Sequence, residues 1–377
     1  MNLNIDTITT AMKQKGLSQT DLARSLDVSR EAVSKWLRRD AVPRPGRVLR
    51  LAQLLELSFD DVYGADLVAE PVVAFRKKAA VRTRGHHHER AMDMGKMLRN
   101  LAPYLPAQPL NYPAQFIDPQ PEYGYVERAA GEIRAQMGLR GDIVDFADII
   151  SFFADVHAIL IPVMWGSRKQ HENALHIHLP DSHTTWVYLN LDTRIMDFKF
   201  WMAHELAHVK APTLPDSEAE TFADMFAAEL LFPIAAAEHF YGRLRNVRAP
   251  GSLILETQRI ATEFVVSPVT VLSQMNRLAE RHGDSGWEVN IHEATSNFNK
   301  QFADVNRTVF GTEHPPAKTF ISVAGETFNT PFYRMLSAYL RDTGKQSSFV
   351  QRVLNINPLD AKSLHQALIA GETEDPA

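Results

Sequence analysis

The sequence predicts an α+β chain that is mostly helical, and three patterns support this class. Apolar residues at helical spacing recur through the first 66 residues, as expected for a compact five-helix module. Two segments of alternating character lie near the middle of the chain, at 173–180 and 184–191, and predict a small sheet. Helical patterns then continue from residue 251 toward the end, so we expect a C-terminal helical region.

The N-terminal segment from Gly16 to Leu37 has the pattern of two short helices joined by a tight turn. Ser18 and Asp21 form a capping box at the start of the first of them. The apolar positions expected for the core of a helix-turn-helix are Leu22, Leu26, Val28, Val33, Trp36 and Leu37. The segment resembles the XRE, or phage-repressor-like, helix-turn-helix family over about residues 1–65, although Asp27 stands where that family often has Gly. Aspartate tolerates the left-handed conformation that such a turn uses.

This resemblance implies DNA binding by a recognition helix that begins near Ser29. Arg30, Glu31 and Lys35 are expected to face base edges in the major groove, whereas Gln19 and Arg38 are placed to reach phosphates. The alternative is a helical module that binds only protein. Local charge argues against it, because residues 24–50 hold eight basic and three acidic residues, a net of +5 in a chain of net charge -5. Modules of this type usually bind paired half-sites, so we expect a homodimer on a double-stranded DNA operator.

Residues 67–122 have the composition of a connector. A basic run occupies 75–85, and prolines recur between Pro103 and Pro121. The basic run could follow DNA or bind an acidic partner, but a solvated linker is the more common outcome. His86, His87 and His88 are consecutive, so they share no face, and we interpret them as surface residues.

The central region, 123–250, is expected to contain the sheet. Helical patterns at 125–137 and 143–153 lead into a strand at 158–164, and the two alternating segments then form a hairpin around Asp181-Ser182-His183. A substrate peptide could add to this hairpin as another strand. Four side chains on or near it could donate to an oxyanion, but a lone strand histidine is usually structural, so we assign no catalytic role to His171, His176, His178 and Tyr188.

The most informative motif is His204-Glu205-Leu206-Ala207-His208, in a segment at 197–210 that lacks Pro and Gly and is followed by Pro212. On a helix, residues four apart share a face, so both imidazoles could bind one Zn²⁺ ion. The carboxylate of Glu205 could then take a proton from a water that the metal has made acidic, which is the chemistry of a metallopeptidase.

A third ligand would distinguish such a site from two histidines packed by chance near a glutamate. Glu220 stands twelve residues after His208, although Ser217 and Glu220 also form a capping-box pattern that would give Glu220 a structural role. Glu218 is the other candidate. We prefer Glu220 as the ligand, with Asp224 as an acceptor that orients a ligand histidine.

These residues also carry a family resemblance. The segments 200–208 and 220–233 resemble the signature of the ImmA/IrrE-type metallopeptidases. The resemblance implies a zincin-like, gluzincin-type fold and activity, with zinc bound by His204, His208 and Glu220, and with Glu205 as catalytic base. The chain has Asp224 and Phe232 where that family usually has Asn and Met.

The region 251–377 is expected to be helical, and its segment 260–278 has the pattern of a second helix-turn-helix-like unit. ImmA/IrrE-like proteins often have such a unit after the peptidase core. It lacks a dense basic face, so we interpret it as a packing or sensing element rather than a DNA-binding one. Apolar residues at helical spacing between Phe328 and Leu340 indicate core packing, and residues 371–377 are expected to be disordered.

Composition excludes several classes of protein. The 377 residues include 45% hydrophobic residues, enough for more than one core. No apolar run is long enough to span a membrane, and no signal-peptide pattern begins the chain, so we expect no membrane partner. The absence of cysteine excludes disulfides and thiolate metal sites and agrees with a cytoplasmic location and with His/Glu ligation of zinc.

Three functions are consistent with this organisation. The first is a transcriptional regulator whose peptidase domain cleaves a repressor or its own DNA-binding module, since ImmA/IrrE-like peptidases typically inactivate helix-turn-helix repressors. The second is an autoregulating antitoxin that neutralises a cognate toxin and uses the peptidase-like domain as a scaffold. The third is a sensor of a small ligand without catalysis, which Glu205 disfavours because a structural zinc site needs no base. We rank them in this order.

Overall fold

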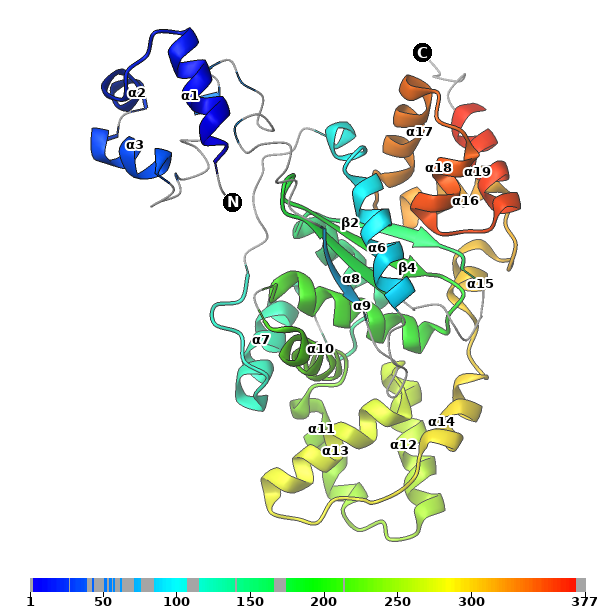
Figure 1. The fold of residues 1–377 in the computed structure, drawn as a ribbon. Coiled ribbons are helices and arrows are strands. Elements are labelled where there is room, and N and C mark those ends of the chain that lie inside the picture. The colour runs from blue at the N-terminus through cyan, green and yellow to red at the C-terminus, as the bar shows by residue number, and fades with distance from the viewer. Residues whose placement is uncertain are drawn as a thin grey trace. The chain divides into compact units, whose positions relative to one another are not determined.

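A computed structural model describes the chain apart from residues 1–2, 27, 39–42, 44–50, 53, 56, 58–61, 63–70, 76–84, 107–114, 140, 166–173, 213 and 371–377. The chain divides into two compact units, Met1–Glu70 and Pro71–Ala377. The structure confirms the predicted class, a mostly helical α+β protein with a small sheet (Figure 1). Among the described residues, none of the helices combines the length and the apolar character that crossing a bilayer requires.

The first unit contains the predicted helix-turn-helix. Its bounded helices are α1 (Ile5–Gln14), α2 (Gln19–Ser25) and α3 (Arg30–Leu37), and helical positions recur at 51–52, 54–55 and 62. Ser18 and Asp21 form the predicted capping box of α2. The core comprises Ile8, Leu22, Leu26, Val33, Trp36, Leu51, Leu55 and Val62 together with smaller neighbours. Asp27 and much of the basic segment after Arg38 lie outside the described residues.

The second unit is built around a four-stranded sheet in the order β1-β3-β4-β2. The strands are β1 (Val72–Phe75), β2 (Ala158–Val163), β3 (Ala174–Leu179) and β4 (Thr184–Asn190). β3 and β4 form the predicted hairpin, and β2 pairs with β4 in parallel. β1 pairs with β3 antiparallel, in the register Val72 with His178 and Phe75 with Leu175.

The expectation of a connector at 67–122 is therefore wrong for part of that segment. Besides β1, it contains α6 (Gly85–Leu98) and the short 3-10 helix η2 (Ala102–Tyr104). α6 contacts both β1 and β3, and buries Met94 and Leu98 in the main core. The apolar residues of 91–101 are spaced for a helix, and burying them outweighs the basic composition that precedes them. The basic run at 76–84 and the side chains of His86, His87 and His88 lie outside the described residues.

Helices cover the two faces of the sheet in different ways. α9 (Ile195–Lys210) contacts β3 and β4, while α8 (Phe146–Asp155) contacts both α9 and β2. Neighbouring strand residues point to opposite faces. His176 stacks on His208 of α9, so the adjacent Ile177, which lies close to α6, belongs to the opposite face. On that face Trp186 also meets Phe332 of a C-terminal helix.

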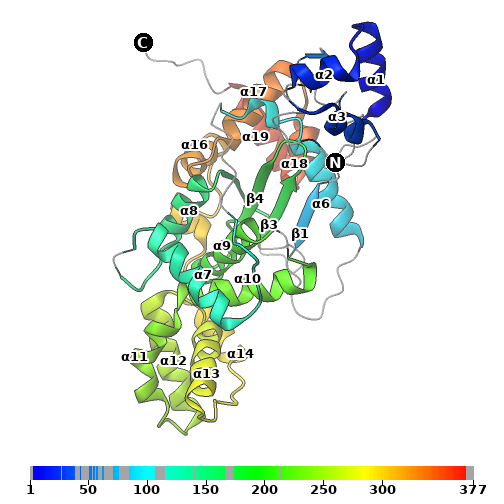
Figure 2. The same cartoon turned by 90° about the vertical axis from the view of Figure 1, so that its left-hand side faces the viewer.

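Further helices extend the second unit at both ends of the sheet (Figures 1 and 2). α10 (Asp216–Leu231) lies beside α9, and α7 (Tyr123–Gln136) lies beside α10. α11 (Ile234–Leu244), α12 (Pro250–Phe264), α13 (Pro268–His282) and α14 (His292–Asn299) follow along the chain. The opposite end holds α16 (Ala317–Thr327), α17 (Phe332–Thr343), α18 (Ser347–Leu354) and α19 (Pro358–Ala370), which α15 (Val305–Phe310) connects to the rest.

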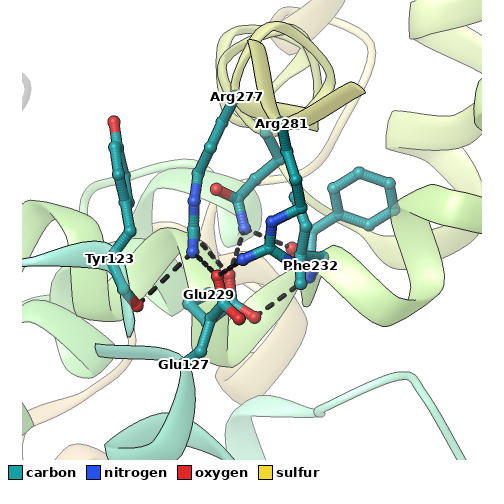
Figure 3. A network of polar contacts seen from close by, with 8 residues as sticks. Tyr123, Glu127, Glu229, Phe232, Arg277 and Arg281 are labelled. Atoms are coloured by element: carbon teal, nitrogen blue, oxygen red, sulfur yellow. Dashed lines mark hydrogen bonds and ion pairs between the residues drawn. The ribbon is translucent and has the colours of Figure 1, made fainter. Parts of the chain in front are cut away.

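A buried charge network joins α10 to α13 (Figure 3). Glu229 Oε2 lies 2.8 Å from Arg277 Nη1, and the two side chains are 4% and 5% exposed. Gln274 Nε2 donates to the same carboxylate at 2.7 Å and to the carbonyl of Phe232 at 2.9 Å. The backbone N–H of Ile234 donates to Glu229 Oε1. Desolvating an ion pair costs free energy, which this complete set of hydrogen bonds offsets.

Glu127 of α7 extends the network to a third helix (Figure 3). Arg277 and Arg281 both bind its carboxylate, and the guanidinium of Arg277 lies 4.0 Å from the centroid of the Tyr123 ring. Both arginines of α13 are thus engaged in contacts within the unit. α12 and α13, which span the segment expected to form a second helix-turn-helix-like unit, thus pack together, and α13 packs on α10.

We expect Glu229→Ala to lower the free energy of unfolding of the second unit by about 3–5 kcal/mol, because it removes the more buried of the two carboxylates that bind Arg277 and the acceptor of the Ile234 N–H. Urea unfolding followed by tryptophan fluorescence measures this change. Glu263→Ala is the matched control, since Glu263 is an exposed residue of α12 and its loss should change stability by less than about 0.5 kcal/mol. Equal effects of the two substitutions would contradict a stabilising role for the network.

Candidate metal centre

The two histidines of the central motif lie on the buried face of α9. His204 and His208 are 0% and 6% exposed, and Glu205 between them is 1% exposed. α9 is uninterrupted from Ile195 to Lys210 and ends two residues before Pro212, as its composition predicts. The rings of His204 and His208 are 4.8 Å apart between centroids, so one helical turn brings both imidazoles to one point.

Lys199, a buried residue of α9, connects this helix to α12. Lys199 is 1% exposed, and its Nζ donates to the carbonyl of Phe264 at 3.0 Å. Phe264 is the last residue of α12, so the ammonium group meets the negative end of that helix. Burial lowers the pKa of Lys199 to about 8, while Asp145 and Asp148 act in the opposite direction. The motif helix is thereby tied to α12.

The third candidate ligand comes from α10. This helix begins at Asp216, with Pro215 as N-cap and no side-chain cap. Glu220 is thus the fifth residue of the helix, one turn inside it, where its backbone N–H is already bonded within the helix. The capping-box interpretation of Ser217 and Glu220 is therefore wrong. Glu218, the other candidate, is exposed and is not part of the donor cluster.

His204, His208 and Glu220 converge on one point. Their Nε2 and carboxylate oxygen atoms are separated by 3.1 Å between the histidines, 3.6 Å from His204 to Glu220 and 3.5 Å from His208 to Glu220. Among the described residues, these three form the group of donors that could hold a metal ion. Zinc ligands about 2.0–2.1 Å from a tetrahedral ion lie roughly 3.3–3.4 Å from one another, so the observed spacing fits zinc.

The donor set also fits zinc chemically. Two imidazoles and one carboxylate are a common catalytic zinc set, and three protein ligands leave a fourth position for water or substrate. The half-exposed carboxylate of Glu220 opens the cluster to solvent on the α10 side, with its side chain 34% exposed. These residues could therefore hold a catalytic metal ion rather than a closed structural one.

Asp224 lies where it can orient His204. Its Oδ1 is 3.0 Å from Nδ1 of His204, and its side chain is 49% exposed. In the tautomer with the proton on Nδ1, His204 donates to Asp224 and directs the lone pair of Nε2 toward Glu220 and His208. Carboxylate partners of this kind fix the tautomer of metal-binding histidines. Phe232, the other departure from the expected signature, is fully buried against Phe264.

The acidic surroundings change the protonation of His208. Burial alone would lower the pKa of His208, but its bond to Glu220 and the nearby charges of Glu205, Glu220 and Asp224 together raise that pKa. A site that favours positive charge in this way suits a divalent cation. A bound cation would replace the proton, because only neutral imidazole can ligate.

Sequence reasoning missed the contribution of His176. This β3 residue is 5% exposed, and its ring stacks on His208 at 6.2 Å between centroids and 19° between planes. Burial, reinforced by His208 and His178, lowers the pKa of His176 to about 3, so its imidazole is neutral. Alternation placed His176 on one face of the strand, but only packing shows that this face meets the motif. His178 and Tyr188 instead bond Thr185 and the carbonyl of Val353, and His171 lies outside the described residues.

In the first unit, four of the five predicted DNA-contacting residues lie on or directly after α3, and the fifth lies on α2. Arg30, Glu31 and Lys35 are exposed residues of that helix, and Arg38 is its exposed C-cap. Gln19 is the first residue of α2 and is half-buried. Ser29 caps α3 by accepting from the N–H of Ala32, and Arg30 and Glu31 in the first turn of the helix are exposed. This is the arrangement that a recognition helix requires.

Comparison with known proteins matches a family model to each of two segments of the chain. A family model described as helix-turn-helix matches residues 8–62, and a peptidase family model described as the IrrE N-terminal-like domain matches residues 165–276. The second match includes α9, α10 and the donor cluster, but it begins after β1, α6 and β2. No curated protein and no solved structure matches the chain. The chain therefore joins a helix-turn-helix segment to an IrrE N-terminal-like peptidase segment, the fusion that its motifs predict.

Proposed function

We propose that the protein is a DNA-binding transcriptional regulator with a zinc-dependent endopeptidase domain. The observation that carries the proposal is the convergence of His204, His208 and Glu220, with Glu205 buried beside them, in a chain that also has a helix-turn-helix. A role on DNA implies that it acts in the cytoplasm.

In this proposal His204, His208 and Glu220 hold the metal, and Asp224 orients His204. A zinc ion bound there supplies Lewis acidity and makes a water molecule acidic enough to ionise near neutral pH. Glu205 would act as general base toward a water molecule and then as general acid toward the amine that leaves when the peptide bond breaks. Burial of Glu205 suits this exchange, because it removes competing bulk water from the carboxylate.

The first unit directs the protein to an operator. We assign base contacts to Arg30, Glu31 and Lys35, and phosphate contacts to Gln19 and Arg38, in a homodimer that binds two half-sites. The protein substrate is then a repressor or the protein's own DNA-binding module, and its cleavage changes transcription. Tethering the peptidase to an operator raises its local concentration near proteins bound at the same site.

We expect the zinc-loaded full-length chain to cleave a helix-turn-helix repressor from its own genome at a specific bond, and Glu205→Gln to reduce the rate constant by at least about 100-fold, because the base is lost while the metal ligands remain. Chelation should also stop cleavage, and added zinc should restore it. Electrophoresis with mass spectrometry of the fragments measures this, with Glu263→Gln as an exposed-glutamate control.

The opposite result would be equal processing by the wild-type and Glu205→Gln proteins. If both proteins also suppressed the toxicity of a neighbouring gene product equally, the antitoxin function would replace proteolysis.

For the DNA-binding unit, we expect Arg38→Ala to weaken binding to all sequences and to reduce the slope of log K against log salt concentration by about one, as the loss of one phosphate contact does. Arg30→Ala should cost about 1–3 kcal/mol and relax specificity at one base pair. Fluorescence anisotropy on duplexes selected from a random pool by the full-length chain measures both. Lys13→Ala, on an exposed position of α1, is the control, and an effect as large as that of Arg38→Ala would contradict the assignment.

A further inference from the structure

β1 covers one edge of β3. The sheet order places β4 on one side of β3 and β1 on the other, so without β1 the strand β3 would be an edge strand. β1 has only four residues, and it comes from a segment that precedes the match to the IrrE N-terminal-like domain. An uncovered edge presents a row of backbone N–H and C=O groups that an extended chain can pair with.

The same edge runs beside the candidate metal centre. His176 of β3 stacks on the ligand candidate His208, and Ala74 of β1 is the residue paired with His176. Any segment that pairs with β3 in this register therefore passes next to the cluster. Peptides commonly bind by adding a strand to an exposed sheet edge, where backbone hydrogen bonds supply affinity.

We propose that the β3 edge is the pairing site for an extended segment of the polypeptide substrate, and that β1 occupies this site in cis. This inference rests on the proposed peptidase function and adds its regulation. The substrate class is a polypeptide that can present an unpaired, extended segment of at least four residues, recognised mainly through its backbone. A substrate segment and β1 cannot pair with β3 at the same time.

The backbone pairing of β1 with β3 is short, which makes exchange feasible. Four residues pair with β3, and each such hydrogen bond contributes only about 0.5–1.5 kcal/mol net. At its start, Pro71 packs against Gly95 of α6, where a Cβ would lie 2.6 Å from Pro71 Cβ. The same Cβ would lie 3.2 Å from Ile177 Cγ2 of β3, so the glycine lets α6 pack closely on Pro71 and on β3. β1 belongs to the same chain as β3, so its effective concentration is high. Pairing of β1 with β3 is therefore still favoured over pairing of a separate substrate segment.

Paired proline substitutions provide the first test. In an antiparallel ladder alternate residues direct their N–H groups to the partner strand, so one of Val73 and Ala74 donates to β3 and the other points away. Val73→Pro and Ala74→Pro are then matched, since only one removes a hydrogen bond to β3. Both are made in the zinc-loaded, full-length Glu205→Gln protein, which binds without cleaving. The probe is a fluorescein-labelled peptide with the sequence of residues 70–76.

We expect one proline variant to bind the probe about tenfold more tightly than the parent protein, because the tethered competitor no longer pairs. The other variant should bind as the parent does. Fluorescence anisotropy measures the affinities, and circular dichroism with metal analysis confirms that both variants are folded and loaded. Probe binding that is unchanged from the parent in both variants would overturn the proposal.

A reversible lock provides the second test. The chain has no cysteine, so Val72→Cys with His178→Cys, at directly paired positions, introduces a single disulfide between β1 and β3. In a protein with Glu205 intact, we expect the oxidised form to cleave a repressor at least about tenfold more slowly than the same protein after reduction. The single variant His178→Cys should be insensitive to reduction. Equal rates for the oxidised and reduced forms would show that substrate does not use the β3 edge and would overturn the proposal.

The two tests separate this inference from the proposed function. If the probe binds as expected but neither the reduced double-cysteine protein nor the wild type cleaves any repressor, the peptidase function fails while the pairing site on β3 is supported. If the wild type cleaves and the lock has no effect, the peptidase function is supported and the role of β1 is rejected.

Discussion

The packing of α9 against α10 is the constraint on which the rest of the second unit depends. His204 and His208 come from one helix and Glu220 from the other, and their ligand atoms are 3.1–3.6 Å apart. A displacement of either helix by about 1 Å would exceed the tolerance of about 0.2 Å that zinc ligation allows. The surrounding contacts therefore have to fix two helices rather than three separate side chains.

Buried charged side chains hold α9 and α10 against neighbouring helices. Lys199 ties α9 to the end of α12, and Glu229 ties α10 to Arg277 of α13. Burying a charged group costs desolvation free energy, which is offset only when its hydrogen-bond and ion-pair partners are in place. Apolar contacts are non-directional and allow two helices to shift along each other, whereas these polar contacts require one relative position of the helices. The α12 and α13 pair thus supports the geometry of the candidate metal centre, and its Arg277 and Arg281 bind carboxylates of the same unit.

Sequence reasoning reached the local features and missed the long-range ones. The four-residue spacing of His204 and His208 determines their common face, and the absence of Pro and Gly predicts α9. Helix starts are harder to predict. Pro215 is the N-cap of α10, so this helix begins one turn before Glu220, and Ser217 does not have the capping role that its spacing from Glu220 suggested. β1 has only four residues beside a basic run, too short for a periodic signal. The contact of His176 with His208, and the pairing of Glu229 with Arg277, join residues far apart in sequence and follow only from tertiary packing.

The proposed function depends on one claim, that His204, His208 and Glu220 hold zinc while Glu205 does not. Metal analysis of the purified full-length chain tests it most directly. We expect about one zinc ion per chain in the wild type and in Glu205→Gln, and nearly none in His204→Ala or His208→Ala. His282→Ala, which removes a histidine 42% exposed on α13, should retain the wild-type content. Undiminished zinc in His204→Ala would contradict the proposed site.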